Sequence, residues 1–500
     1  MLTASMAPLM FAALVLFLLL GYPVAFSLAA NGLYFGLLGV ALGLLSPDLF
    51  QALPERVYGI MYNDTLLAIP FFTFMGLILE RSGMAEDLLD TVGQLFGPVR
   101  GGLAFAVVFV GALLAATTGV MAASVISMGL ISLPIMLRYG YDRRLASGII
   151  AASGSLAQII PPSLVLIVLA DQIGRSVGDM YQGALWPALL LCVLYGGFVL
   201  LVSIVRPEAV PALPVTARRL RGWRLYRHAL LVMVPPLCLI FLVLGTIFLG
   251  VATPTEGGAM GATGALVLAL VRQRLSWQLL KQAMDSTAKL SSFVLFILIG
   301  SAVFGLVFRA VDGDLWVEQL LTELPGGELG FLIVVNILVF LLAFFLDFFE
   351  LAFIIIPLLV PVAEKLGIDL VWFGVLLGIN MQTSFMHPPF GFALFFLRSV
   401  APASVRTAEI YWGAVPFVVI QLIMVAIVIA VPGLVTQGST TTEHIDPNEI
   451  QIDLPPPPVD LQPIEIPPPG EVFKERAGNE GAFGDDVTHA IERARQADGQ

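Results

Sequence analysis

The sequence predicts an all-α polytopic membrane protein, arranged as an inverted repeat with two re-entrant helical hairpins and two helices broken by paired prolines. Of its 500 residues, 58% are hydrophobic and 12% are charged, which is too apolar for a soluble chain with an ordinary core. Apolar runs long enough to cross a bilayer recur from residue 7 to residue 432. Paired prolines, Pro161-Pro162 and Pro388-Pro389, interrupt two of these runs.

The two proline pairs are the features that relate the halves of the chain. Proline lacks a backbone N–H and breaks a helix, so backbone groups near each pair lose their intrahelical partners. Residues 139–142 precede the first pair as residues 366–369 precede the second, with the same offset of 227 residues that separates Pro161 from Pro388. Matched broken helices in two halves of a chain indicate the binding site of a transporter.

The first half covers residues 1–205. Residues 46–62, which include Pro47 and Pro54, are expected to form a loop. Residues 101–137 are apolar but carry small hydroxyl residues at their centre, which favours two limbs of about 16 residues, ~24 Å each, over one long helix. The elements expected in order are spans at 7–20, 24–45 and 63–80, an interfacial helix at 80–97, a hairpin at 101–137, a broken helix at 145–169 and a span at 181–205.

The second half covers residues 229–435 and follows a basic linker at 206–228 that holds six arginines. Residues 347–350 are the polar centre of its hairpin, and Asp347 matches Ser124 when the two hairpins are aligned on Pro134 and Pro357. The inverted repeat is therefore expected to bring Asp347 close to Asn380 and the break at Pro388. The expected elements are spans at 229–250, 255–271 and 290–308, an amphipathic segment that ends at 289, an interfacial helix at 311–324, a hairpin at 331–362 and a broken helix at 370–397.

The distribution of basic residues predicts the orientation. If residues 138–144 and the linker are cytoplasmic, 17 Lys and Arg residues lie inside and four lie outside, as the positive-inside rule requires. Both termini are then periplasmic. The first hairpin opens to the cytoplasm and the second to the periplasm, and both tips are expected to meet the broken helices near the midplane.

Residues 436–500 form a separate, Pro-rich acidic tail. Residues 433–500 hold thirteen Asp and Glu against four Lys and Arg, so most of the net charge of −11 belongs to this end of the chain. Consecutive prolines and few aromatic residues favour an extended or disordered tether over a packed domain.

Oxygen-bearing residues gather at the two breaks and the two hairpin tips. Sodium is a hard cation that oxygen ligands bind, and no His, Cys or carboxylate cluster here has the spacing of a transition-metal site. Alternatively, these small residues only let helices approach closely. The candidate sodium ligands are Thr117, Thr118, Gly119, Ser124, Ser153, Gly154, Ser155, Asp347, Asn380, Gln382 and Thr383.

Asp347 and Glu350 are the most informative charges, because a carboxylate deep in an apolar run costs ~2.5–3.5 kcal/mol on insertion scales. Alternatively, they reach water at the hairpin mouth or pair with Arg309 or Arg398. Half-helix N-termini beside the breaks would favour an anionic substrate, and His387 is equally well explained as an interior histidine. The candidate substrate residues are Pro161, Pro162, Ser163, Glu350, His387, Pro388, Pro389 and Arg398.

Five short motifs stand in order along the chain: Gly-Tyr-Pro-Val-Ala-Phe at 21–26, Leu-Ala-Ile-Pro-Phe-Phe at 67–72, Ile-Ile-Pro-Pro-Ser at 159–163, Thr-Pro-Thr-Glu at 253–256 and His-Pro-Pro-Phe-Gly at 387–391. On these motifs, residues 1 to about 435 resemble the large permease subunit of TRAP (tripartite ATP-independent periplasmic) transporters. Residues 347–350 and 390–398 are similar to the branch labelled for 2-oxo acids, mannitol or chloroaromatic acids. The first hairpin departs from the family's Ser-Gly-Ser, since residues 118–120 read Thr-Gly-Val, so no hydroxyl ligand carries over to residue 120.

This resemblance implies an elevator-type ion transporter fold and a sodium-coupled importer of a small carboxylate, such as a 2-oxo acid or a dicarboxylate, in the bacterial inner membrane. The implied partners are a small four-span membrane subunit and a periplasmic solute-binding receptor, with the lipid bilayer and no nucleic acid. Sodium is the expected coupling ion, and no cofactor is expected. No phosphate-binding Gly-Lys-Ser/Thr loop occurs, so the chain is not expected to consume ATP.

Two other function classes stay open at this point. A stand-alone sodium/organic-anion symporter would share the hairpins and broken helices but need no receptor. A membrane-embedded enzyme is disfavoured because the intramembrane carboxylates sit on one hairpin without a zinc motif, so the chain is not expected to be an enzyme.

Overall fold

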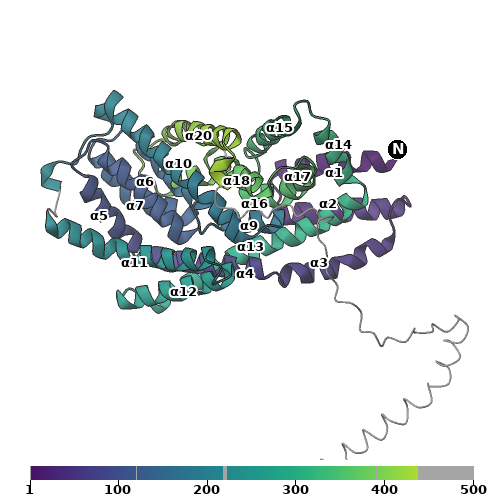
Figure 1. Ribbon diagram of the computed structural model, residues 1–500, viewed down its shortest axis with the longest axis horizontal. Coiled ribbons are helices and arrows are strands. Elements are labelled where there is room, and N and C mark those ends of the chain that lie inside the picture. Colours follow the sequence, from purple (N-terminus) through teal and green to yellow (C-terminus); the bar gives the residue numbers. More distant parts are fainter. Residues whose placement is uncertain (1, 120, 218–221, 389–390, 437–500) are drawn as a thin grey trace, which may run out of the picture. The chain divides into compact units, whose positions relative to one another are not determined.

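Helices make up all the regular structure in the described part of the chain, which comprises residues 2–119, 121–217, 222–388 and 391–436 of a computed structural model (Figure 1). Six helices are long and apolar enough to cross a membrane, or eight if each of two bent pairs counts as one span, among these residues. The prediction of an all-α polytopic membrane protein is therefore confirmed. Pro389, Arg218, Arg219, Arg221 and the tail from residue 437 lie outside the described residues.

The first two helices, α1 (Leu2–Leu19) and α2 (Val24–Ala41), are joined through Gly21, whose φ of +79° favours glycine. Helix α2 packs along α13 (Trp277–Ala310). A Cβ on Gly32 would lie 2.9 Å from backbone atoms of Val303, so glycine allows the two helices to approach this closely. Helix α13 runs unbroken for 34 residues and includes both the expected amphipathic segment and the expected span at 290–308.

The loop expected at 46–62 is helical instead. A 3-10 helix (Pro47–Gln51) leads into α3 (Ala52–Met61), and α3 meets α4 (Asp64–Arg81) at a bend of 46°. Pro47 and Pro54 lie in the first turns of these elements, where a missing N–H costs no hydrogen bond. Asn63 caps α4 by accepting from the backbone N–H of Thr65 at 2.9 Å. Prolines that read as loop residues therefore mark helix starts.

Helices α6 (Gly102–Thr118) and α7 (Met121–Arg138) occupy the predicted first hairpin, with 17 and 18 residues, and lie side by side (Figure 1). Helix α6 ends at Gly119, which has a φ of +56°. The second hairpin is less regular: α15 (Gly327–Leu342) ends before a short α16 (Phe348–Glu350), a π-helix (Leu351–Ile355) and α17 (Ile356–Lys365).

The two broken helices have matching structures. In the first, α8 (Arg143–Ser155) continues into a 3-10 turn (Leu156–Gln158) before α9 (Leu164–Ile173). In the second, α18 (Leu370–Met381) continues into a 3-10 helix (Gln382–Met386) before α19 (Phe392–Val400). Asp142 and Asp369 cap the two starts, accepting from Leu145 N at 3.0 Å and Trp372 N at 2.7 Å. The repeat detected in the sequence is thus also a repeat of conformation.

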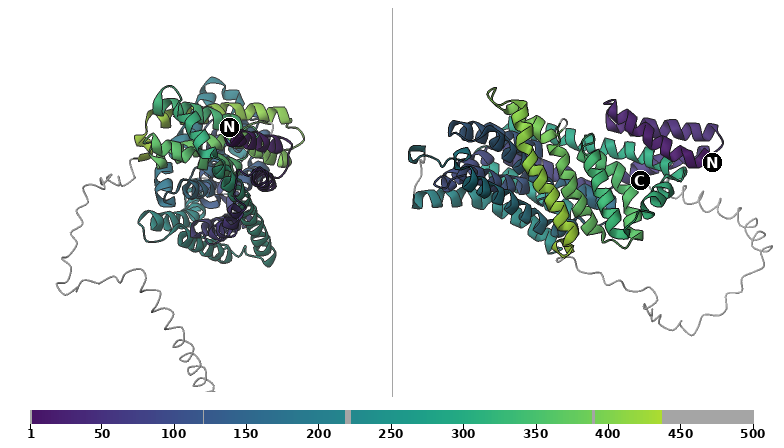
Figure 2. Two further views of the ribbon diagram at one scale, coloured as in Figure 1. Left: turned by 90° about the vertical axis from the view of Figure 1, so that its right-hand side faces the viewer. Right: turned by 90° about the horizontal axis from the view of Figure 1, so that it is seen from above.

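The broken helices form the centre of the helical bundle. All residues of α18 are buried, and α8 is buried from Leu145 onward. Helix α20, the long yellow-green helix of Figure 2, packs against α8 where Gly148 and Gly413 face each other and neither backbone leaves room for a Cβ. The remaining elements are α5 (Met84–Phe96), α10 (Val177–Val205), α11 (Trp223–Phe248), α12 (Pro254–Val271), α14 (Gly313–Thr322), α20 (Thr407–Ala430), α21 (Gly433–Thr436) and 3-10 turns at Pro207–Ala209 and Val215–Ala217.

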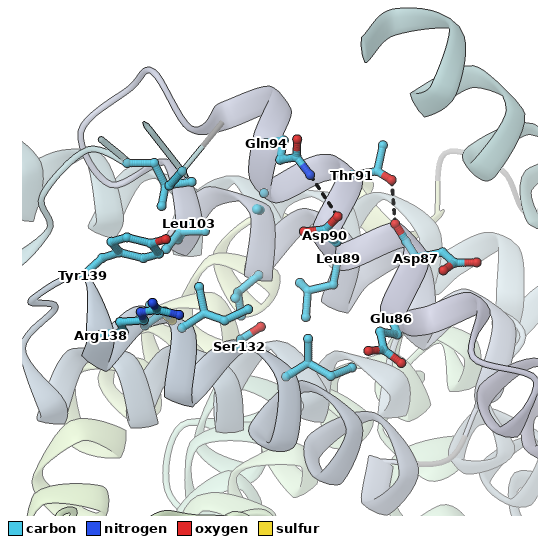
Figure 3. Close-up of a pocket in the computed structure, with 18 of the residues that line it drawn as sticks. Glu86, Asp87, Leu89, Asp90, Thr91, Gln94, Leu103, Ser132, Arg138 and Tyr139 are labelled. Atoms are coloured by element: carbon cyan, nitrogen blue, oxygen red, sulfur yellow. Dashed lines mark hydrogen bonds between the residues drawn. The ribbon is translucent and has the colours of Figure 1, made fainter. Parts of the chain in front are cut away.

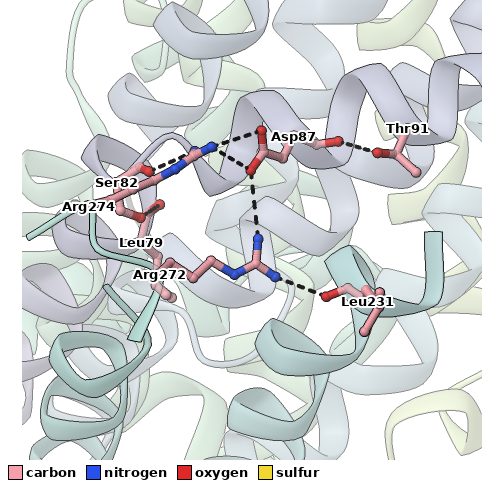
Figure 4. A network of polar contacts seen from close by, with 7 residues as sticks. All are labelled: Leu79, Ser82, Asp87, Thr91, Leu231, Arg272 and Arg274. Carbon is pink, nitrogen blue, oxygen red and sulfur yellow. Dashed lines mark hydrogen bonds and ion pairs between the residues drawn. The ribbon is translucent and has the colours of Figure 1, made fainter. Parts of the chain in front are cut away.

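A polar network holds the start of α5 against the end of α12 (Figure 4). Asp87 pairs with Arg274 at 3.0 Å and with Arg272 at 3.7 Å. Arg274 also donates to Ser82 O at 3.1 Å, and Arg272 donates to Leu231 O at 2.9 Å. The network therefore joins the α4–α5 turn to the helical pair α11–α12.

Candidate functional site

The two breaks meet through side chains that occupy equivalent positions in the repeat. Gln382 Nε2 donates to Ser155 Oγ at 3.1 Å, and these residues are separated by 227 positions, as the proline pairs are. Ser155 Oγ in turn donates to Ala152 O at 2.8 Å. The pseudo-symmetry axis of the repeat therefore passes near this contact.

At the first break, Ser153 is fully buried, and its Oγ has no hydrogen-bond partner among the described residues. A Cβ on Gly111 of α6 would lie 2.6 Å from Ser153 Cβ, so the hairpin limb packs directly on this position. At the hairpin tip, a Cβ on Gly119 would lie 3.0 Å from Pro162 O. The first hairpin thus covers the first break, as the sequence predicted.

The other candidate site residues of the first half make contacts or hydrogen bonds within the fold. Thr117 Oγ1 donates to Leu114 O at 2.9 Å, and Ser124 is buried within α7. Gly154 faces Val125 at close range. Ser163 caps α9 and donates to Gln158 O, while the Pro161-Pro162 peptide bond is cis. The side chain of Thr118 lies outside the described residues.

At the second break, Asn380 occupies the position equivalent to Ser153. Its Nδ2 donates to Asn336 O at 2.7 Å and to Asn336 Oδ1 at 2.9 Å. Thr383 Oγ1 donates to Asn380 O at 2.6 Å. Asn380 Oδ1, Gln382 Oε1 and Ser384 Oγ are buried without hydrogen-bond partners in the part of the chain that the structure describes. Both halves therefore present an unpaired oxygen at the same position of the repeat.

The sequence analysis did not identify Asn336, which lies on the first limb of the second hairpin. An amide in an otherwise apolar helix is a signal in itself, because a polar side chain at membrane depth normally has a bonding partner or a function. Asn336 joins the limb α15 to the broken helix α18 and so positions Asn380.

Asp347 and Glu350 do not reach Asn380 through any contact seen among the described residues. Instead they form a capping box at the start of α16, in which Asp347 Oδ1 accepts from Glu350 N at 2.8 Å and Glu350 Oε2 accepts from Asp347 N at 2.9 Å. A helix that starts inside the protein needs such acceptors for its free N–H groups. Both carboxylates border a cavity of about 720 Å³ whose other walls include Tyr22, Phe293 and Phe296.

The alternative, in which these carboxylates pair with Arg309 or Arg398, finds no support, since no such ion pair occurs among the described residues. Arg398 donates to Val405 O at 2.6 Å. His387 is buried between aromatic rings, stacked on Phe344 at a centroid distance of 4.2 Å and edge-on to Phe340 at 4.5 Å. The first limb of the second hairpin therefore covers the second break just before Pro388.

The atoms at the breaks that could coordinate a cation are hydroxyl, amide and backbone oxygens. Within the described residues, no group of three or more His, Cys, Asp or Glu side chains could hold a metal ion. A largely uncharged set of oxygens suits a hard monovalent cation better than a transition metal. Such oxygens could be supplied, without breaking an existing hydrogen bond, by Ser153, Asn380, Gln382 and Ser384.

Comparison with known proteins yields one family and several relatives. Residues 11–434 match the family described as tripartite ATP-independent periplasmic transporter, DctM component. The C4-dicarboxylate TRAP transporter large permease protein DctM of Pseudomonas aeruginosa is 31% identical over 396 residues, which cover 78% of this chain and 90% of that protein. The sialic acid TRAP transporter large permease protein SiaM of Vibrio cholerae is 28% identical, with 82% and 93% covered.

Two solved structures share the fold. The YdaH transporter of Alcanivorax borkumensis superimposes with a TM-score of 0.55 at 18% identity, covering 78% of this chain and 90% of that chain. MtrF of Neisseria gonorrhoeae gives 0.51 at 13% identity, with 77% and 83% covered. At these identities the likeness concerns the arrangement of helices alone.

Proposed function

Because the chain belongs to the DctM component family of tripartite ATP-independent periplasmic transporters, we propose that it is the membrane permease of a sodium-coupled importer for a small organic acid. It is a multi-pass membrane protein of a transporter family, which is not an enzyme class. The observation that supports the finer proposal is the pair of equivalent oxygens at Ser153 and Asn380, buried without hydrogen-bond partners among the described residues.

Sodium coupling would explain why these oxygens are kept. A buried polar group without a hydrogen-bond partner costs ~1–3 kcal/mol of folding free energy. If several such groups in one region bound no ligand, they could be replaced by apolar groups without loss of stability. A sodium ion that moves down ~100 mV contributes about 2.3 kcal/mol, which can drive accumulation of an acid. We assign the first ion position to Ser153 and the second to Asn380, Gln382 and Ser384.

The packing of the two hairpins supports the proposal of an elevator motion. Each hairpin covers one break, so hairpins and broken helices would move together as the transport unit. Helices α2, α4, α12 and α13 pack against one another and would form the stationary scaffold. The predicted orientation places the two hairpins at opposite membrane faces, as alternating access requires.

The proposed substrate is a carboxylate in the broad sense. Two of the relatives are named as transporters of C4-dicarboxylates and of sialic acid, and both kinds of substrate carry a carboxylate group. The proposed partners are a small four-span membrane subunit and a periplasmic solute-binding receptor, which would select the acid. We place the complex in the bacterial inner membrane, with both termini of this chain in the periplasm.

Reconstitution tests the proposal. The chain would be purified with the four-span subunit, placed in proteoliposomes and supplied with receptor loaded with its acid. We expect uptake only with both an inward sodium gradient and the receptor. Uptake that continues at full rate without the receptor would instead indicate a stand-alone symporter, and uptake unaffected by replacing sodium with potassium would contradict sodium coupling.

A further inference from the structure

Two cavities lie at equivalent places in the two halves, each against the second limb of a hairpin. The first, of about 590 Å³, is bordered by Ile131 and Ile135 of α7. The second, of about 490 Å³, is bordered by Ile354 of the π-helix and Leu358 of α17. Alignment of the hairpins on Pro134 and Pro357 makes these two pairs of residues equivalent. The predicted orientation assigns the first cavity to the cytoplasmic side and the second to the periplasmic side.

The two cavities differ in the charges on their scaffold walls. Helix α5 lines the first cavity with Glu86, Asp87 and Asp90 (Figure 3). The second cavity is lined instead by two arginines, Arg56 of α3 and Arg309 in the last turn of α13. Two carboxylates, Asp171 and Asp314, also line the second cavity, so its formal charges balance. What these carboxylates bind therefore decides whether the arginines can attract an anion.

Neither arginine of the second cavity has an ion-pair partner in the part of the chain that the structure describes. Arg56 and Arg309 line the same cavity. Two guanidinium groups held together in one cavity are stabilised when an anion lies between them.

The acidic residues beside this pair are already engaged. Asp171 accepts from Asn63 Nδ2 at 2.6 Å through one carboxylate oxygen and from Gln172 Nε2 at 2.8 Å through the other. Asp314 lies in the first turn of α14, where the helix N-terminus stabilises a negative charge. Neither carboxylate forms an ion pair with Arg56 or Arg309 among the described residues, so both guanidinium groups keep their N–H donors for a ligand.

Resting on the proposed function, we propose that Arg56 and Arg309 form an entry site that captures the carboxylate of the acid before it reaches the breaks. The volume of the cavity is within the range of small-molecule sites. Helix α9 leads from Ser163 at the first break to Asp171 and Gln172 in the cavity wall, a rise of ~12 Å at 1.5 Å per residue. The apolar wall formed by the second hairpin would accommodate the body of the acid.

Uptake measurements in proteoliposomes test the site in the complete complex. We expect Arg56→Gln and Arg309→Gln each to raise the half-saturating concentration of loaded receptor by roughly tenfold, because each removes a charge-assisted contact. The rate at saturation should change less. Arg175→Gln is the matched control, since this exposed arginine is outside the cavity but on the same predicted side. Equal half-saturation in all three variants and the wild type would overturn the proposal.

Chemical protection tests the site without transport. Purified complex would be treated with phenylglyoxal, and modification of individual arginines would be followed by mass spectrometry. Pyruvate or succinate should slow modification of Arg309, whereas 1,4-butanediol or sodium chloride at matched ionic strength should not. Modification of Arg175 should stay the same throughout.

The outcomes separate this inference from the proposed function. Protection by neither acid would overturn the entry site even if the wild type transports. Protection by substrate-free receptor alone would assign the arginines to receptor docking and would also overturn it. If the wild type does not transport but the acids protect Arg309, the site stands and the proposed coupling fails.

Discussion

At the scale of single residues, Ser155 and Gln382 link the halves of the molecule through one hydrogen bond between equivalent positions. Ser155→Ala removes the acceptor of the Gln382 amide in a fully buried place. The loss should cost ~1–3 kcal/mol of unfolding free energy and weaken sodium activation of uptake. Ser203→Ala is the control, since the Ser203 hydroxyl on α10 donates to Leu200 O of its own helix at 2.7 Å. Equal sodium activation in both variants would remove Ser155 from the ion site.

Thr383 tests the second ion position. Its hydroxyl donates to Asn380 O, which leaves the Oγ1 lone pairs available beside the unpaired Asn380 Oδ1. We expect Thr383→Ala to raise the sodium concentration needed for half-maximal uptake, while Thr383→Ser retains the wild-type value. Identical sodium titrations for the alanine and serine variants would show that the hydroxyl serves only the helix turn.

Asp347 has two roles that a conservative substitution separates. Asparagine caps a helix about as well as aspartate, so Asp347→Asn should leave α16 and the thermal stability largely intact. It removes the negative charge beside the cavity, and we expect strongly reduced sodium-coupled uptake with normal insertion and receptor docking. Uptake at the wild-type rate with the same sodium dependence would restrict Asp347 to capping.

At the scale of elements, the close packing of α6 on α8 determines whether the first hairpin can cover Ser153. Gly111→Ala adds a methyl group where only 2.6 Å separates it from Ser153 Cβ, so the hairpin must shift. We expect a lower melting temperature and weaker sodium activation. Gly196→Ala on α10 has open space around its Cβ and should be neutral or slightly stabilising. Unchanged sodium activation in Gly111→Ala would show that the ion position does not depend on this contact.

The elements that the sequence could predict are those with strong local signals. Paired prolines, spanning length and a polar interruption located the breaks and hairpins within a few residues. The helix α3 was wrongly predicted as loop because Pro47 and Pro54 were read as breakers rather than as residues of first turns. The length of α13 was also missed. Its first turns are amphipathic and differ from the apolar pattern of a membrane span, but no helix-stop signal separates them from the span that follows.

Side-chain partnerships were harder to predict, because they depend on which helices meet. The sequence selected Asn380 but gave no reason to pair it with Asn336, 44 residues earlier. It placed Asp347 close to Asn380 by repeat symmetry but gave no sign that this carboxylate caps α16, whose residues contact the 3-10 helix Gln382–Met386 of the second break. Arg56 counted only toward orientation, and Arg309 was also considered as a partner of Asp347 and Glu350, until the structure placed both arginines in one cavity.

At the scale of the whole molecule, the transport unit and the tail are separable in sequence. The family match ends at residue 434, and the acidic Pro-rich segment follows it. We expect truncation after Thr436 to leave uptake and its sodium dependence unchanged in proteoliposomes. A truncated protein that is stable in detergent but inactive would assign the tail a role in transport.

The most direct test of sodium binding at the breaks is the melting temperature of purified wild type and Ser153→Ala in sodium and in potassium. A ligand that binds only the folded state stabilises it, so the wild type should melt at a higher temperature in sodium. In potassium, Ser153→Ala should be at least as stable as the wild type, since it removes a buried hydroxyl that has no partner among the described residues. The account predicts that this variant loses most of the sodium-specific rise. The same rise in both proteins would contradict it.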